Sequence, residues 1–98
     1  MLQFERKMGC TTADLMRWLP QALGELYSDT SLVVDGQALK EVHNPRLQIF
    51  GSNQPIRKIA LLEIPVLEVK LLFSGSWAKS DCEAVLNRFD LYTRRGGG

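Results

Sequence analysis

Reactive and metal-binding side chains are scarce in this chain, which has two cysteines, Cys10 and Cys82, and a single histidine, His43. No Cys or His stands at the short spacings of a zinc site, so we expect no metal and no cofactor. The sequence also lacks a Gly-x-Ser-x-Gly motif, a phosphate-binding glycine loop and a dinucleotide fingerprint. These absences argue against the common enzyme classes, and the sequence indicates no catalytic residue.

A surplus of one charge is also missing. Twelve Lys and Arg stand against eleven Asp and Glu, for a formal net charge of +1, and the basic residues are scattered. This distribution argues against nucleic acid as a partner. The longest apolar stretch, residues 59–73, is interrupted by Glu63, Pro65, Glu68 and Lys70, so we expect no membrane span.

The first seven residues carry no uninterrupted apolar core and no small-residue cleavage site, unlike a secretory signal. Two thiols without an export signal are typical of reduced cysteines. We therefore expect a cytoplasmic protein with free thiols. A Cys10–Cys82 disulfide is the alternative.

The length of 98 residues and the 45% hydrophobic content are typical of one small globular domain, which we place at residues 1–93. Periodicity predicts an α+β fold with an antiparallel sheet of about five to six strands. Residues 2–7 form the first strand in this prediction. A helical segment follows over residues 12–26, either one helix kinked at Pro20 or two short helices, with Thr11 or Thr12 as its cap and Asp14 in its first turn.

The predicted strands lie between residues 32 and 73. Asp35-Gly36 favours a tight hairpin turn, because both residues tolerate positive φ angles. Residues 51–55 carry Gly, Ser, Asn and Pro and are expected to form a loop. Pro65 indicates a turn, a bulge or a sheet edge, and we favour two strands that meet there at a sharp join.

The amphipathic helix predicted over residues 80–92 packs on one face of the sheet. Ser80 and Glu83 have the spacing of a capping box at its start. The apolar positions recur at three and four residues and comprise Cys82, Val85, Leu86, Phe89 and Tyr92. Cys82 is expected to be a core residue, although a thiol in the first turn of a helix has the alternative of acting as a nucleophile.

A candidate ligand site lies between this helix and the sheet. Trp77 follows a Gly-Ser break and is the tryptophan better placed to line the mouth of a groove. We expect Trp77, Leu86 and Tyr92, with Phe73 at the strand end, to contact a small apolar ligand there.

The order of strand, helical segment, antiparallel strands and closing helix resembles the helix-grip architecture of plant pathogenesis-related, lipid-transfer and polyketide-cyclase-like proteins. The resemblance implies an apolar pocket between the sheet and the last helix. We therefore expect a small non-catalytic module that binds an apolar ligand. The alternative is a protein-interaction or homodimerisation module without a small ligand, which uses an exposed sheet edge or apolar patch.

Residues 94–98 are expected to form a flexible Arg/Gly tail. Arg94-Arg95-Gly96-Gly97-Gly98 resembles the Arg-Gly-Gly ends of ubiquitin-like modifiers and sulfur carriers, which implies activation at the terminal carboxylate. The structural alternative is that the arginines suit the negative end of the helix and Gly96 terminates it.

Overall fold

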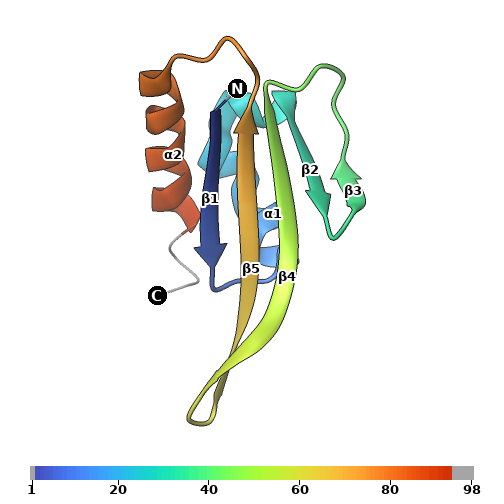
Figure 1. Ribbon diagram of the computed structural model, residues 1–98, viewed down its shortest axis with the longest axis vertical. Coiled ribbons are helices and arrows are strands. Elements are labelled where there is room, and N and C mark those ends of the chain that lie inside the picture. Colours follow the sequence, from blue (N-terminus) through green and yellow to red (C-terminus); the bar gives the residue numbers. More distant parts are fainter. Residues whose placement is uncertain (1, 94–98) are drawn as a thin grey trace.

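A sheet covered on one face by two helices forms the body of the protein in the computed structural model, which describes residues 2–93 (Figure 1). Within these residues the sheet has five strands in the order β1-β5-β4-β2-β3. The elements in chain order are β1 (Leu2–Met8), α1 (Thr12–Leu23), the 3₁₀ helix η1 (Gly24–Asp29), β2 (Thr30–Val34), β3 (Gln37–Lys40), β4 (Leu47–Ile59), β5 (Leu62–Phe73) and α2 (Lys79–Thr93). The α+β class is thus confirmed. The tail at 94–98 lies outside the described residues.

The sheet is mixed, so the expectation of a purely antiparallel sheet was wrong. β4 runs parallel to β2 from Leu47 beside Thr30 to Gly51 beside Val34. The reason is the connection over residues 41–46, which returns from β3 past β2, so that β4 enters on the opposite side of β2 and in the same direction. Arg46 holds this connection, because its N–H donates to the Asp29 carbonyl at 2.8 Å.

The amino-terminal helical segment begins as predicted and ends differently. The Thr11 hydroxyl accepts from the Asp14 N–H at 3.1 Å, and the Asp14 carboxylate accepts from the Thr11 N–H at 3.2 Å, which completes a capping box. α1 continues through Pro20, and Gly24, at φ 59°, marks its end. A 3₁₀ helix follows, so the segment forms two successive helices, one of the two expected alternatives, and they divide at Gly24 rather than at Pro20.

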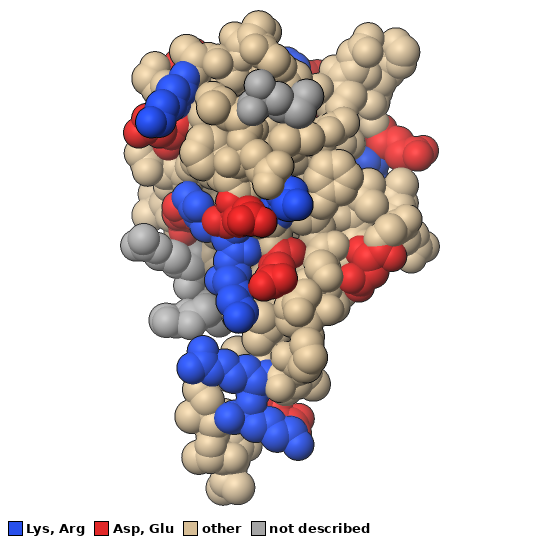
Figure 2. Space-filling model, viewed as in Figure 1, with Lys and Arg blue, Asp and Glu red and all other residues tan. Residues whose placement is uncertain are grey.

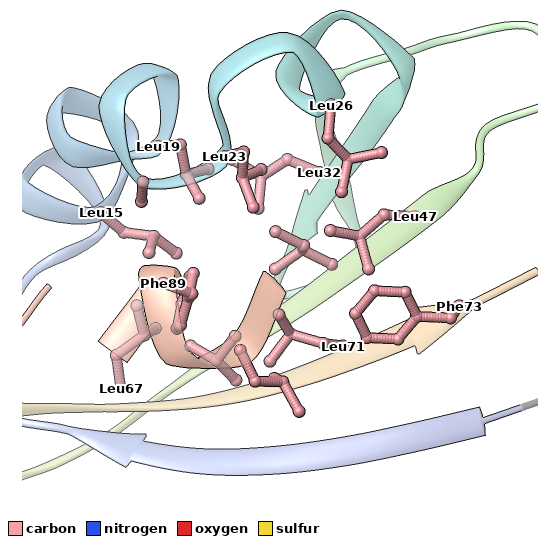
Figure 3. Close-up of a cluster of buried hydrophobic side chains, with 14 of the residues drawn as sticks. Leu15, Leu19, Leu23, Leu26, Leu32, Leu47, Leu67, Leu71, Phe73 and Phe89 are labelled. Atoms are coloured by element: carbon pink, nitrogen blue, oxygen red, sulfur yellow. The ribbon is translucent and has the colours of Figure 1, made fainter. Parts of the chain in front are cut away.

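The core lies between the sheet and the helices. Phe89 of α2 is fully buried against the inward-facing side chains of β5, among them Leu67 and Leu71 (Figure 3). This arrangement confirms the predicted amphipathic helix on one face of the sheet. α2 starts at Lys79, one residue before the expected start, so Ser80 lies in the first turn rather than at the cap.

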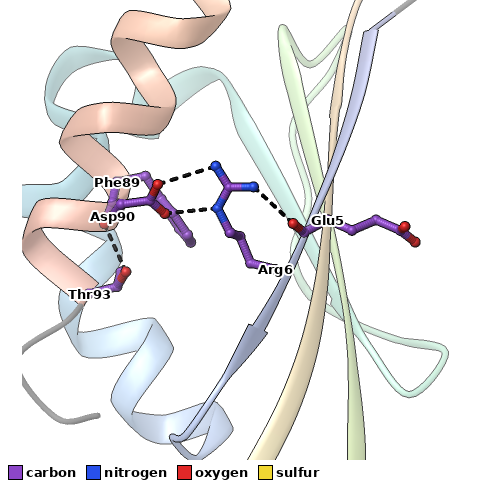
Figure 4. A network of polar contacts seen from close by, with 5 residues as sticks. All are labelled: Glu5, Arg6, Phe89, Asp90 and Thr93. Carbon is purple, nitrogen blue, oxygen red and sulfur yellow. Dashed lines mark hydrogen bonds and ion pairs between the residues drawn. The ribbon is translucent and has the colours of Figure 1, made fainter. Parts of the chain in front are cut away.

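A two-point ion pair joins β1 to α2. Arg6 Nε and Nη2 donate to the two oxygens of Asp90 at 3.0 and 3.2 Å, and both side chains are about one-third exposed (Figure 4). Arg6 Nη1 also donates to the Glu5 carbonyl at 2.9 Å. The fixed fork of the guanidinium sets the angle between helix and strand more tightly than a single contact does.

The hairpin of β4 and β5 is longer than expected. Residues 51–55 are not a loop, and the chain does not turn at Pro65, since the turn lies at Ala60 and Leu61. Pro55 lies where the pairing register shifts, between Gln54 and Arg57, and Pro65 lies opposite it, between Ile64 and Val66. A β-bulge tolerates a residue without an N–H, so the strands continue through both prolines.

Candidate interaction site on the β4–β5 arm

Two of the residues predicted to bind a ligand lie in contact. The rings of Phe73 and Trp77 meet edge to face with centroids 5.0 Å apart. Trp77 Nε1 donates to the Arg46 carbonyl at 3.0 Å, and the Arg46 guanidinium lies 4.8 Å from the centre of the Trp77 ring. These contacts fix the Trp77 ring over the end of the sheet.

The other two predicted residues lie elsewhere on α2. Leu86 is buried in the core, and the half-buried ring of Tyr92 lies 5.3 Å below the Arg88 guanidinium. The pocket beside Trp77 has a volume of about 400 Å³ and is lined by Arg46, Ser74, Ser76, Trp77, Asp81, Ala84 and Val85. That pocket does not include Phe73, Leu86 or Tyr92. Binding of an apolar ligand by the four residues stays a prediction.

The reactive side chains are poorly placed for chemistry. Cys10 and Cys82 are both buried and free. Burial, reinforced by Asp14, raises the pKa of Cys10 to about 11, and burial, reinforced by Asp81, raises the pKa of Cys82. Within residues 2–93, no three His, Cys, Asp or Glu side chains gather to hold a metal ion.

The distal part of the β4–β5 hairpin projects beyond the body of the protein (Figure 1). β1 pairs with β5 only from Leu67 onward, and β2 pairs with β4 only as far as Gly51. Residues 54–66, which we call the arm, therefore form a ribbon whose two edges meet no other strand of residues 2–93.

Large aliphatic side chains are exposed along the arm. Leu61 is fully exposed, and Leu62, Ile56 and Ile59 are 64%, 57% and 45% exposed. Ala60, at the turn, has a φ of 54°, which an L-residue adopts at a cost. The tip of the arm, residues 59–62, is thus apolar and carries an unusual turn residue. Local sequence patterns did not predict this site, because Ala60-Leu61 lacks the glycine that usually marks a two-residue turn.

Most aliphatic side chains of the arm share one face, which also carries Arg57, whereas the opposite face carries the Lys58–Glu63 pair. Cross-strand pairs share a face, and the pairs Ile59 with Leu62, Arg57 with Ile64 and Gln54 with Val66 alternate with the pair Lys58 with Glu63. The Lys58 ammonium lies 3.9 Å from the Glu63 carboxylate. Figure 2 shows basic side chains along the arm and an uncharged end. The aliphatic side chains at 59, 62, 64 and 66 consequently form one stripe.

A groove lies at the root of the arm, where β1 ends. It has a volume of about 550 Å³, and its lining comprises Lys7, Met8, Gly9, Gln54, Pro55, Arg57, Ile64 and Val66. We call this the root groove. Its lining combines apolar with polar side chains, and both of its charged residues are basic. The apolar tip and the root groove lie at opposite ends of the same arm.

The uncovered face of the sheet body is different in character. Glu5 lies opposite Lys70, and Lys7 lies opposite Glu68, so charges of opposite sign alternate across β1 and β5 (Figure 2). A shallow pocket of about 520 Å³ on this face contains Phe50 among these charged residues. Alternating exposed charges are typical of a solvated face, which leaves the arm as the main apolar surface.

Comparison of the chain with protein families, with curated proteins and with solved structures gives no match. The helix-grip resemblance therefore stays a prediction. Among the described residues, no helix combines the length and the apolar character that crossing a bilayer requires.

Proposed function

We propose that this protein is a non-catalytic protein-interaction module that forms a homodimer through the β4–β5 arm. The observation that carries the proposal is the exposure of Leu61, Leu62 and Ile59 at the end of a ribbon with two free edges. This function requires neither a reaction nor a small ligand in a pocket.

The physical basis is the low stability of an isolated ribbon. A two-stranded hairpin in water is marginally stable unless it packs against something else. The body provides the arm with no third strand among residues 2–93, and the aliphatic side chains at the tip of the arm face solvent. Burial of apolar surface contributes roughly 25 cal/mol per Å², so packing against another apolar surface stabilises the arm as well as the complex.

The composition of the tip supports a binding role rather than a folding role. A two-residue hairpin turn forms best with Asn-Gly or Asp-Gly, and the β2–β3 hairpin of this chain uses Asp35-Gly36. The arm instead places Ala60 and Leu61 at its turn. Ala60 is held at a positive φ, and Leu61 gains nothing from its exposed position. A partner surface that covers Leu61 accounts for both features.

A protein surface suits this tip better than a lipid surface. Lys58 and Glu63 immediately flank the apolar residues of the tip. Insertion of the tip into a bilayer deeper than these residues carries a carboxylate and an ammonium out of water, which is costly. A complementary protein surface covers the aliphatic side chains and leaves both charges at its rim, where they stay hydrated.

Sedimentation velocity over micromolar to near-millimolar protein concentrations tests the proposal. We expect the wild-type chain to dimerise and the Leu61→Asp, Leu62→Asp double variant to stay monomeric. The control is Leu91→Asp, which places one aspartate at an exposed leucine of α2, 67% exposed, and should dimerise like the wild type.

A wild-type chain that is monomeric at every concentration overturns the proposal. If the arm and α2 substitutions weaken dimerisation equally, the proposal is also overturned, because the association is then nonspecific. Co-sedimentation of the monomeric protein with anionic vesicles, lost in the arm variant, assigns the tip to a lipid surface instead.

A further inference from the structure

We infer that, in the homodimer proposed above, the tip of each arm lies in the root groove of the other copy. The inference rests on the proposed function and assigns its contact surface. Each copy contributes one apolar tip and one root groove, so one chain contains both halves of the contact.

The two surfaces match in chemistry. The root groove has the partly buried side chains of Ile64 and Val66 in its lining, together with Met8, which also packs against the core. The tip presents Leu61 and Leu62, which are more exposed than any of these. Burial of two leucines against three aliphatic or thioether side chains removes apolar surface from water on both copies.

The length of the arm sets the arrangement. Leu62 and Val66 are four residues apart on β5, or about 13 Å along an extended strand. When two arms lie antiparallel about a two-fold axis, Leu62 of each copy reaches Val66 of the other at the same time. Such a contact is isologous and closes at two copies. Tips that meet each other leave both root grooves empty.

The prolines favour side-chain packing over strand addition. Pro55 and Pro65 lack an N–H, and they lie in the irregular part of the arm on β4 and β5, respectively. Proline fits poorly in a regular ladder, so a continuous ladder with another strand is disfavoured along the arm. The aliphatic stripe, by contrast, runs uninterrupted past the prolines from Leu62 through Ile64 to Val66.

The charges permit the contact. Lys7 and Arg57 make the root groove basic, whereas the Lys58 and Glu63 charges beside the tip offset each other. A neutral tip therefore enters the basic groove without repulsion, and the like charges that remain near the two-fold axis are the two Arg57 side chains beside Ile64. The net charge of +1 of the whole chain adds little repulsion between copies.

Engineered cysteines test the arrangement, with Leu62→Cys at the tip and Val66→Cys in the root groove. The two positions are about 13 Å apart within one chain, beyond the Cα separation of roughly 7 Å that a disulfide spans. A bond between them therefore requires two copies. The native Cys10 and Cys82 are buried, so the wild-type chain serves as the control for background oxidation.

We expect the Leu62→Cys, Val66→Cys double variant to oxidise to a covalent dimer with two disulfides. An equimolar mixture of the two single variants should give a heterodimer with one disulfide, and neither single variant alone should cross-link. Mass spectrometry without reduction identifies each species.

Cross-linking of Leu62→Cys alone indicates tips in contact and overturns the inference. Open-ended oligomers from the double variant overturn the closed two-fold arrangement. A dimer in sedimentation that forms no tip-to-root disulfide overturns the inference and leaves the proposed function standing, whereas a chain that is always monomeric overturns both.

Discussion

Asn53 and Asp35 are joined by a pair of hydrogen bonds at the point where β4 leaves β2. The Asn53 N–H donates to Asp35 Oδ1 at 3.0 Å, and Asn53 Nδ2 donates to Asp35 Oδ2 at 2.8 Å and to Thr12 Oγ1 at 3.2 Å. One side chain thereby connects the β2–β3 turn, the start of α1 and the base of the arm. The direction in which the arm projects depends on this junction.

Asn53→Ala removes the side-chain part of the junction. Because the groups are exposed and water replaces the lost partners, we expect the free energy of unfolding to fall by only about 1 kcal/mol. Urea unfolding at neutral pH measures the change. Asn87→Ala, at an exposed position of α2, is the control and should not destabilise. If Asn53→Ala lowers the free energy of unfolding no more than Asn87→Ala does, the Asn53–Asp35 hydrogen bonds do not stabilise the fold.

The closing helix carries a larger share of stability. Phe89 is fully buried between α2 and β5, so Phe89→Ala leaves a cavity and should lower the free energy of unfolding by about 3–5 kcal/mol. Leu91→Ala removes a leucine from the exposed side of the same helix and should change it by less than about 0.5 kcal/mol. Similar effects of the two substitutions in urea unfolding would mean that α2 does not close the core.

Local signals in the sequence were sufficient for part of this fold. The turn at Asp35-Gly36 has φ angles of 51° and 80°, as its residue types predict, and the capping box of Thr11 and Asp14 forms. The apolar spacing of α2 likewise predicted which of its sides is buried. Each of these signals spans only a few residues, and the same residues supply the physical cause.

The parts that were missed depend on distant residues. The parallel pairing of β4 with β2 is set by the path of residues 41–46, which no local pattern encodes. Gly51 to Pro55 carry loop-forming residues, yet the ladder with β5 holds them in a strand. Pro65 was predicted to separate two strands, because the β-bulge opposite it cannot be inferred without knowing the partner strand. The arm, and the candidate site on it, follow from these pairings.

The two thiols should be unreactive in the folded protein. Burial raises the pKa of both Cys10 and Cys82, so little thiolate is present at pH 8, and the sulfur atoms are shielded from reagents. We expect slow modification by iodoacetamide in native buffer and rapid modification of both in urea. Mass spectrometry at successive times measures the rate of modification of each cysteine under both conditions. Rapid modification of Cys82 in native buffer would revive its alternative role as a nucleophile.

Acid should weaken the start of α1. The Thr11 N–H and hydroxyl bonds and the nearby Arg17 guanidinium lower the pKa of Asp14 from its ordinary value of 3.8. A lowered folded-state pKa means that the stabilisation is present above 3.8 and is lost as the pH falls through the folded value. Melting curves between pH 6 and strong acid should therefore show a shallower acid decline for Asp14→Asn. An unchanged acid decline contradicts the role of the capping box.

The tip of the arm should show opposite effects on folding and on association. Replacement of Ala60 by Gly and Leu61 by Asn gives residues that suit a turn with a positive φ at its first central position, and relief of the strain at position 60 should raise the free energy of unfolding by a few tenths to about 1 kcal/mol. The same double variant removes the fully exposed leucine, so dimerisation should weaken at least tenfold, the equivalent of about 1.4 kcal/mol. The single variant Ala60→Gly separates the two effects, because it relaxes the backbone and keeps Leu61. We expect it to be more stable than the wild type and to dimerise equally well in sedimentation. If the double variant instead dimerises like the wild type, Leu61 is not part of the contact, and the apolar tip has some other cause.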